Sequence, residues 1–306
     1  MSYAVKISQD DDGRRLDRTL RGMFRHETLG EIMKAIRKGD IRINGVRVRD
    51  GSVHLSAGDE LVAPWNVGSD DTDKPTKFTG WGKIQVVFQG VNVLMLNKPA
   101  GILVQPDEPG GDSVISRVWG VFGTKTPSPV HRLDRNTTGI LAVALHGDAL
   151  RAMEELFKAR HVRKVYMAVT VGKMPGEVMI DAPLLKDAEN NTVKVCEDGL
   201  KALTRCRCLA YDGEYSLTEI ELLTGRTHQA RVHTAHIGHP ILGDRKYGDF
   251  NANRKMKSIN RPLLHAYELE FPEDLPDSLS EVAGKKFTAP LPDDMKNFIT
   301  ARRLQE

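Results

Sequence analysis

A polar stretch early in the chain separates two parts of different character. Residues 65–80 are rich in Asp, Asn, Ser, Thr, Gly and Pro and have little hydrophobic periodicity, which is typical of a linker. The residues before it are rich in arginine, whereas apolar runs typical of β-strands begin after Trp81. A chain of 306 residues is also long for one compact core. We therefore expect two domains, at 14–64 and 81–306.

Positive charge is concentrated in the first part. Between Arg14 and Arg49 there are eleven Lys and Arg residues against four Asp and Glu. Clustered cations of this kind are typical of a surface that binds a phosphate backbone, although a solvated helical face would carry the same charges. The candidate RNA contacts are Arg15, Arg18, Lys34, Arg37, Lys38 and Arg47.

The local patterns of this first part predict a small α+β unit. After a short leading strand, apolar residues at helical spacing predict one helix over Arg15–Arg25 and a second that ends at Gly39. Asn44-Gly45 between two alternating segments predicts a β-hairpin. With Arg-Leu-Asp at its start and Gly-x-Ile-x-Ile-Asn-Gly at its hairpin, this segment resembles the S4 RNA-binding domain.

The second part alternates apolar runs with a few helical patterns. Helices are expected at about 112–121, 148–160, 227–236 and 295–303. Strands are expected at about 84–88, 91–96, 102–104, 140–145, 164–171, 192–195, 203–209, 216–222, 264–271 and 286–289. Many strands with few intervening helices predict an α+β fold with a mixed, mainly antiparallel sheet.

Composition excludes several classes of protein. The three cysteines form no C-x-x-C pair, which argues against a disulfide framework and a thiolate zinc site. The sequence has no 18-residue apolar run and no apolar segment near its N-terminus, so we expect neither a membrane span nor a secretory signal. A reducing cytoplasm is the expected compartment.

One polar segment carries a candidate for chemistry. His131–Gly139 precedes the apolar run Ile140–Leu145 and places Asp134 between Arg132 and Arg135. Opposite charges on both sides favour the ionised carboxylate, which can act as a nucleophile, an ion-pair partner or a metal ligand but not as a general acid. Taken alone, these residues are more typical of a surface salt bridge beside a turn.

Four stretches together change this interpretation. They are Leu96–Gly101, His131–Gly139, Arg163–Tyr166 and Leu223–His233. In this order they resemble the RluA family of pseudouridine synthases, in the group that carries an N-terminal S4 domain. The resemblance spans about residues 81–292, and segments 238–244 and 246–249 extend it. The family usually has Ser at Thr138, a change that keeps the hydroxyl, and a branched aliphatic residue at Ala230, a change that removes volume beside the site.

The resemblance implies the pseudouridine synthase fold and an isomerisation of uridine in RNA. The base would be detached from C1′, rotated and rejoined through C5. Asp134 corresponds to the nucleophile, which would attack C1′ or C6. Tyr166 corresponds to the tyrosine that stacks on the base and moves a proton. Arg231 corresponds to the arginine that pairs with the aspartate, with Arg226 as the alternative.

The same resemblance assigns the remaining site residues. Arg132 corresponds to the residue that helps to extrude the target nucleotide, because the reacting atoms are blocked in a stacked helix. Arg226, His228 and Lys98 are the further candidates for substrate binding. No metal or organic cofactor is implied, because the rearrangement is redox-neutral.

The clustered histidines do not predict a metal site. His228, His233, His236 and His239 lie close together in sequence, but Gly238 and Pro240 interrupt the helix and no carboxylate or thiol completes the set. We expect hydrogen-bonded structural or RNA-contacting histidines instead.

Several classes of function stay open at this point. The expected substrate is structured RNA bound by a monomer, and resemblance at Lys246–Asp249 and Leu264–Ala266 favours large-subunit ribosomal RNA over transfer RNA. A non-catalytic RNA-binding or ribosome-assembly protein would be expected to lack Asp134, Tyr166 or Arg231, and all three are present. A glycosidase would need a second acid close to Asp134, and none stands out in these motifs.

Overall fold

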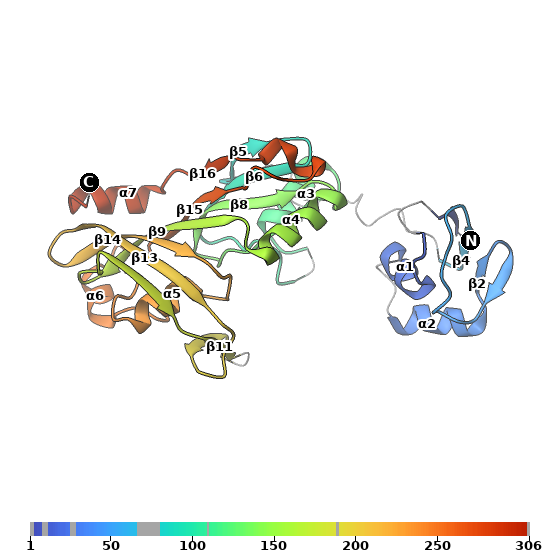
Figure 1. Ribbon diagram of the computed structural model, residues 1–306, viewed down its shortest axis with the longest axis horizontal. Coiled ribbons are helices and arrows are strands. Elements are labelled where there is room, and N and C mark those ends of the chain that lie inside the picture. Colours follow the sequence, from blue (N-terminus) through green and yellow to red (C-terminus); the bar gives the residue numbers. More distant parts are fainter. Residues whose placement is uncertain are drawn as a thin grey trace. The chain divides into compact units, whose positions relative to one another are not determined.

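The chain divides into two compact units, Met1–Lys74 and Pro75–Glu306, each with its own hydrophobic core (Figure 1). The computed structural model describes residues 3–7, 12–24, 29–65, 80–108, 110–187 and 190–304. Most of the predicted linker 65–80 lies outside these residues, so the limits 14–64 and 81–306 stay predictions. No helix in the described ranges is long and apolar enough to cross a membrane.

The first unit packs two helices against a small antiparallel sheet. Its elements are β1 (Tyr3–Lys6), α1 (Leu16–Met23), α2 (Leu29–Lys38), β2 (Ile41–Ile43), β3 (Val46–Val48) and β4 (Glu60–Ala63). The strand order is β1-β4-β2-β3. The sheet thus includes β1, which lies upstream of the predicted domain start at residue 14.

The sequence pattern of this unit accounts for its core. Leu16 and Leu20 recur one helical turn apart on α1 and are fully buried, as are Ile32 and Ile36 on α2. The predicted hairpin turn is present: Asn44 has φ 51° and Gly45 has φ 79°, the left-handed values that a two-residue type I′ turn requires.

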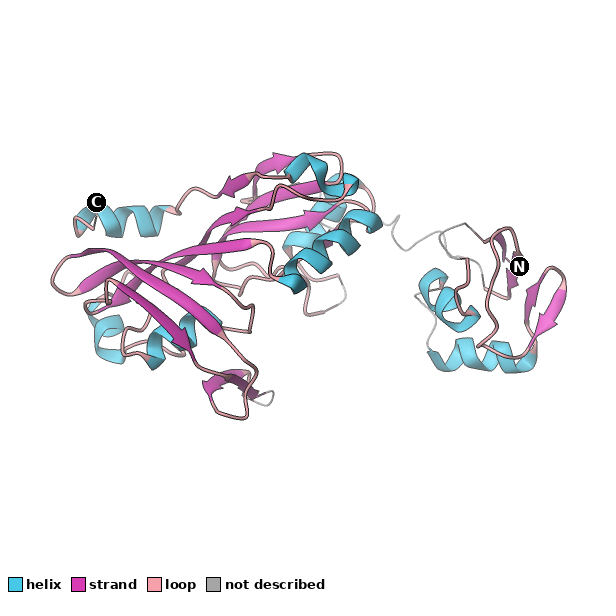
Figure 2. Ribbon diagram, viewed as in Figure 1, coloured by secondary structure: helices cyan, strands magenta, loops and turns pink. Residues whose placement is uncertain are grey.

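The second unit is built on one large sheet (Figure 2). The strands of this sheet are β5 (Gln85–Gln89), β6 (Val93–Lys98), β7 (Ser128–Pro129), β8 (Thr138–Ala144), β9 (Arg163–Val171), β10 (Glu177–Asp181), β13 (Leu203–Tyr211), β14 (Tyr215–Leu222), β15 (Leu264–Glu270) and β16 (Lys286–Thr288). A separate two-stranded sheet is formed by β11 (Leu184–Asp187) and β12 (Thr192–Val195). Its helices are α3 (Val114–Phe122), α4 (Gly147–Ala159), α5 (Gln229–His236), α6 (Phe250–Lys255), the 3₁₀ segment η3 (Asp277–Val282) and α7 (Asp293–Ala301).

The sheet runs in the order β10-β13-β14-β9-β15-β8-β6-β5. Its paired neighbours are antiparallel except β15 and β8, which are parallel. Strand β8 is buried at every position, as expected for a strand at the centre of a sheet that is covered on both faces. The predicted mixed, mainly antiparallel α+β architecture is confirmed.

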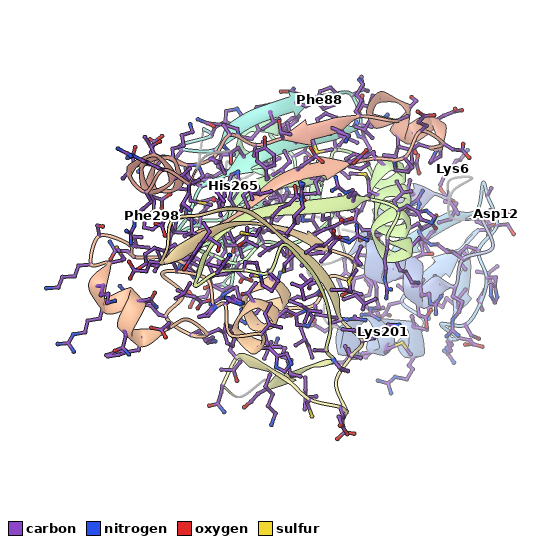
Figure 3. The ribbon with its side chains drawn as sticks, turned by 60° about the vertical axis from the view of Figure 1, so that its left-hand side comes forward. Lys6, Asp12, Phe88, Lys201, His265 and Phe298 are labelled. Carbon is purple, nitrogen blue, oxygen red and sulfur yellow. The ribbon has the colours of Figure 1, made fainter. Side chains whose placement is uncertain are left out.

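Separate groups of helices cover the two halves of the sheet. Helices α3 and α4 join β6 and β8 in the largest apolar cluster, whereas α7 packs with β9 and β14 in a second cluster. Figure 3 labels Phe298 on α7 and His265 within the sheet. The junction between these halves is where β8, β15 and β9 lie side by side, and the loops at their ends carry the candidate site.

A few local elements of the structure differ from those predicted from the sequence. The predicted strand at 102–104 forms only one isolated bridge, between Leu103 and Ser113. The carbonyl groups of Pro99 and Ile102 instead accept hydrogen bonds from the Lys98 ammonium group, so this segment follows a loop. Strands β10 and β11 and helix α6 were not predicted, because their short segments have weak periodicity.

Candidate active site

Asp134 lies in the loop that leads into the buried strand β8. Leu133 beside it is buried, and the Thr137 N–H donates a 3.1 Å hydrogen bond to the Asp134 carbonyl, which closes a turn. An apolar neighbour and a turn therefore fix the backbone, while the carboxylate itself stays 30% exposed. This position suits a reactive group, because a substrate can reach it without displacing the core.

Arg231 on α5 binds this carboxylate from a segment nearly a hundred residues away. Its Nη1 donates a 2.9 Å hydrogen bond to Asp134 Oδ2, as the resemblance predicts. Arg226, the alternative partner, instead donates from Nε to the Lys201 carbonyl at 3.1 Å. Of these two arginines, it is therefore Arg231 that orients Asp134.

Asp244 holds Arg231 in turn, and sequence reasoning assigned it no role. Its two oxygens accept hydrogen bonds from Arg231 Nε at 2.6 Å and Nη2 at 2.9 Å, a bidentate geometry that fixes the guanidinium plane. Oδ1 also accepts the backbone N–H groups of Lys246 and Tyr247. The sequence signal that could have pointed to Asp244 was the segment Gly238–Asp244, which extends the family resemblance. That segment gave no indication that Asp244 is buried.

The charges in this chain of contacts support one another. Burial alone disfavours the charged guanidinium, but the hydrogen bonds and charge of Asp244 outweigh it and raise the pKa of Arg231. Burial also opposes the charged form of Asp244, which is 1% exposed, yet the hydrogen bonds from Arg231 keep the pKa of Asp244 below its usual value. Both groups are therefore fixed as ions next to the candidate nucleophile.

Tyr166 lies on β9, between β14 and β15, and is 9% exposed. Burial, followed by the negative charge of Asp134, raises the pKa of the Tyr166 phenol. The phenol therefore stays protonated at neutral pH, close enough to Asp134 to respond to its charge. A neutral phenol on a rigid strand can stack on a base and exchange a proton with it.

His228 faces the other oxygen of the carboxylate. It precedes α5 with the left-handed values φ 55° and ψ 16°, which are uncommon for a residue with a side chain. Its Nδ1 lies 2.8 Å from the Tyr247 hydroxyl and its Nε2 lies 3.8 Å from Asp134 Oδ1. Burial lowers the pKa of His228, so the imidazole is neutral at pH 7.

Lys98 is fully buried beneath the Asp134 loop. Its Nζ donates to the carbonyl groups of Pro99, Ile102 and Arg135 at 2.8–2.9 Å. Burial lowers the pKa of Lys98 to about 7, and the charge of Asp134 opposes this change. Since all three donor positions of the ammonium group are used, Lys98 is placed to hold the loop rather than to contact a substrate.

Arg261 supports the same loop, and the sequence analysis did not single it out. Its Nη1 donates to the Asn136 carbonyl at 3.3 Å, and it forms a 2.7 Å ion pair with Asp294 in the first turn of α7. Two buried basic side chains, Lys98 and Arg261, thus bind successive carbonyl groups of the Asp134 loop.

The remaining residues of the motif divide into exposed and structural groups. Arg132 is exposed, and its side chain forms no hydrogen bond or ion pair with the described part of the chain. Arg135 is also exposed and pairs with Asp107 at 3.2 Å. His131 accepts the Ala142 N–H and stacks on Phe157. Burial lowers the pKa of His131 to about 3, so this imidazole is neutral.

Thr138 and Gly139 fit the close pairing of β8 with β15. The Thr138 hydroxyl donates to His265 Nδ1 at 2.8 Å, and His265 Nε2 donates to the Ala289 carbonyl. Gly139 has φ 114°, and a Cβ there would lie 2.1 Å from the Ala266 carbonyl oxygen. Only glycine fits this position, whereas Thr138 contributes a hydroxyl that binds His265.

His233, His239 and Ala230, the neighbour of Arg231, have structural contacts. Both ring nitrogens of His233 are used, by Thr204 Oγ1 at 2.8 Å and the Ala182 carbonyl at 2.9 Å. His239 Nδ1 donates to the Val171 carbonyl at 3.1 Å. Ala230 is 4% exposed and belongs to the largest apolar cluster, so its methyl group lies in the core.

In the first unit the predicted RNA contacts are all exposed. They lie on or next to α1, α2 and the β2–β3 hairpin, and comprise Arg15, Arg18, Lys34, Arg37, Lys38 and Arg47. Arg15 forms an ion pair with Asp17 at 2.8 Å. An exposed group of cations is suited to phosphate contacts.

Comparison with known proteins follows the same division of the chain. Residues 92–236 match the RNA pseudouridylate synthase family, and residues 14–61 match the S4 domain. Ribosomal large subunit pseudouridine synthase C from Vibrio cholerae serotype O1 is 33% identical over 98% of this chain and 96% of its own length. The chain belongs to the RNA pseudouridylate synthase family.

Two further relatives support this assignment. Ribosomal large subunit pseudouridine synthase C from Pasteurella multocida is 33% identical over the whole of this chain and 96% of its own length. The solved structure of human RNA pseudouridylate synthase domain containing 4 is 26% identical, with a TM-score of 0.58, and covers 72% of this chain and 94% of that chain. The predicted fold and the predicted class, an isomerase that acts on uridine in RNA, are confirmed. The N-terminal S4 domain makes this synthase an RNA-binding protein.

Proposed function

We propose that this synthase converts uridine to pseudouridine in the RNA of the large ribosomal subunit, with Asp134 as the nucleophile. Support for the RNA comes from relatives named ribosomal large subunit pseudouridine synthase C, which align over 98–100% of this chain. Transfer RNA is the second candidate. The protein would act in the cytoplasm as a monomer.

The contacts of Asp134 carry the mechanistic part of the proposal. Arg231 binds Oδ2, and buried Asp244 fixes Arg231, so the carboxylate is held in one orientation. Oδ1 accepts no hydrogen bond from the described residues and is the oxygen free to react. An ionised carboxylate needs no base to activate it, which suits attack on C1′ or C6 of a flipped uridine.

Other residues would prepare the nucleotide for this attack. Exposed Arg132, two residues before the nucleophile, would enter the helical stack as the target uridine leaves it. Tyr166 would stack on the flipped base, and its protonated phenol would take part in transfer of the C5 proton. Lys98 and Arg261 would keep the Asp134 loop in place through its carbonyl groups. The cations of the S4 domain would supply sequence-independent affinity for the RNA backbone.

The nucleophile can be tested with Asp134→Asn. The amide keeps the shape but cannot attack, so we expect tritium release from [5-³H]uridine RNA to fall by about 10³-fold or more. RNA affinity should stay within a few-fold of wild type, because the backbone contacts are elsewhere. Asp148→Asn is the matched control, since Asp148 is an exposed carboxylate paired with Arg151. Full activity of Asp134→Asn would exclude Asp134 as the nucleophile.

The RNA can be identified separately. Pseudouridine would be mapped in ribosomal and transfer RNA from a strain that lacks the gene, and the purified synthase would be tested on each RNA. We expect the missing modifications to lie in large-subunit RNA and to be restored by the wild-type protein. Modifications missing only from transfer RNA would support the second candidate instead.

A further inference from the structure

Beside Oδ1 of Asp134, the oxygen proposed to react, lies a ring nitrogen for which the described residues offer no hydrogen-bond partner. Because Arg231 Nη1 lies 2.9 Å from Oδ2, Oδ1 is left to face the substrate. His228 Nε2 lies 3.8 Å from Oδ1, which is too long for a hydrogen bond. Nε2 is therefore next to the reacting oxygen but not committed to it.

The contacts on the far side of the ring determine which nitrogen of His228 carries the proton. The Val193 N–H on β12 donates to the Tyr247 hydroxyl oxygen at 2.9 Å. That hydroxyl can then direct its own proton to His228 Nδ1, 2.8 Å away. An imidazole that accepts at Nδ1 carries its proton on Nε2 in the neutral form. Tyr247 therefore makes His228 a donor toward the site.

The surroundings also keep this imidazole neutral. Burial is the main cause of its lowered pKa, and the charge of Arg231 acts in the same direction, whereas Asp134 opposes it. A neutral ring does not form an ion pair with Asp134, so Oδ1 stays free. The groups that face His228 are Asp134, Arg231, Asp244, Lys246 and Tyr247.

Both possible routes of attack create a need for such a donor. When Asp134 attacks C1′, the C1′–N1 bond breaks and its electron pair leaves with the uracil, so negative charge spreads over N1, O2 and O4. When it attacks C6, the electron pair of the C5–C6 double bond moves toward O4. In either case a uracil carbonyl oxygen gains charge, and a fixed donor in a partly buried site stabilises that charge.

We propose that His228 is a catalytic residue that donates its Nε2–H to a carbonyl oxygen of the flipped uracil, and that Tyr247 is the positioning residue that fixes this tautomer. The hydrogen bond is formed without net transfer of the proton, so the ring returns unchanged after each turnover. This inference rests on the proposed uridine isomerisation. It extends the site to Val193 on β12, which orients Tyr247.

Three variants test the proposal in the full-length protein. His228→Phe removes the donor, His228→Gln keeps an N–H near the position of Nε2, and Tyr247→Phe removes only the hydroxyl. Tyr247→Phe keeps the ring that lies 5.0 Å from the Arg231 guanidinium. Tyr211→Phe is the matched control, since Tyr211 is exposed on β13 and its hydroxyl donates to the Gly213 carbonyl. Thermal unfolding would be followed for every variant.

The single-turnover rate at saturating enzyme separates catalysis from RNA affinity. We expect losses of about 10²-fold for His228→Phe and about 10-fold for Tyr247→Phe, with His228→Gln between wild type and His228→Phe. RNA affinity should change by less than about three-fold, because backbone contacts dominate it. Tyr211→Phe should react at the wild-type rate.

A pH profile provides a readout that a structural role would not change. The Tyr247 hydroxyl stabilises the neutral ring, so its removal raises the pKa of His228. Protonated His228 would form an ion pair with Asp134 Oδ1 and block it. The loss of activity as pH falls should therefore begin at a higher pH in Tyr247→Phe than in wild type, and this limb should be absent from His228→Gln.

The outcomes distinguish the inference from the function it extends. Wild-type rates in His228→Phe and Tyr247→Phe, or losses confined to RNA affinity, would overturn the role of His228 while the synthase activity stands. An unchanged acid limb in Tyr247→Phe would overturn the role of Tyr247. If the wild-type protein releases no tritium from any RNA, the proposed function is wrong and this inference fails with it.

Discussion

The S4 unit and the catalytic unit use charged side chains in opposite ways. In the S4 unit the six candidate RNA contacts are exposed, and the core consists of apolar side chains such as Leu16 and Phe24. In the catalytic unit Lys98, Asp244 and Arg261 are each at most 8% exposed, and all three are paired or bound to carbonyl groups.

Because of this difference, the exposed charges should mainly affect RNA affinity and the buried charges should mainly affect catalysis. Exposed cations act on phosphate through solvent, so their effect is weak for each residue, independent of base sequence and sensitive to salt. Buried pairs act over hydrogen-bond distances and fix one geometry, so salt affects them little, but the loss of one partner leaves the other uncompensated. Substitutions in the two units should therefore change different measurable quantities.

After the loss of the nucleophile itself in Asp134→Asn, the largest effect is expected for Asp244→Asn in the catalytic unit. The amide cannot balance the charge of Arg231 or hold both of its nitrogens, so the guanidinium should lose the orientation that fixes Asp134. We expect the single-turnover rate to fall by about 10²- to 10³-fold. RNA affinity and its dependence on salt should stay near wild type in filter-binding measurements.

Asp107→Asn is the control for this experiment, because Asp107 is an exposed carboxylate paired with Arg135 in the Asp134 loop. It should change the rate by less than about three-fold, as expected for a surface pair. If both variants lost activity equally, burial of Asp244 would not be what makes it important.

Deletion of residues 1–64 should have the next largest effect, on RNA affinity rather than on the rate of the reaction. The catalytic unit has its own apolar clusters, so it should fold alone. We expect RNA affinity near physiological salt to fall by about 10- to 100-fold, and each lost phosphate contact should flatten the plot of log affinity against log salt by about 0.7 to 0.9. The rate at saturating enzyme should change by only a few-fold. An unchanged salt slope would contradict phosphate binding by the S4 unit.

Local patterns predicted the fold well, because both units obey simple periodicities. Residues close in sequence determine the apolar faces of α1 and α2, the Asn44-Gly45 turn and the buried strand β8. The hairpin of β11 and β12 was only half predicted. Its first strand is short and partly exposed, so its hydrophobic pattern is weak.

The site was less accessible to sequence reasoning, because its contacts join distant segments. Neighbouring arginines suggested local partners for Asp134, yet Arg132 and Arg135 are exposed and the partner is Arg231. Only the family resemblance indicated that pair. Asp244 precedes Arg245 and Lys246 and therefore looks like part of a charged surface turn. Lys98 likewise looks like a surface lysine before Pro99. Burial makes both important, and burial follows from packing rather than from local spacing.

The smallest effect is expected where a single exposed charge is removed from the S4 unit. Lys34→Gln on α2 should weaken RNA binding by about two- to three-fold and reduce the salt slope by about 0.7 to 0.9, because one counterion fewer is released. The single-turnover rate should not change. The same substitution at buried Lys98 is the informative partner, since its ammonium group holds the Arg135 carbonyl beside Asp134. Lys98→Gln should lower the rate and leave the salt slope as it is. Two results would contradict this view: a slower single-turnover rate in Lys34→Gln, or a changed salt slope in Lys98→Gln. Either would mean that exposed charges do not act only on RNA affinity, or that buried charges do not act only on catalysis.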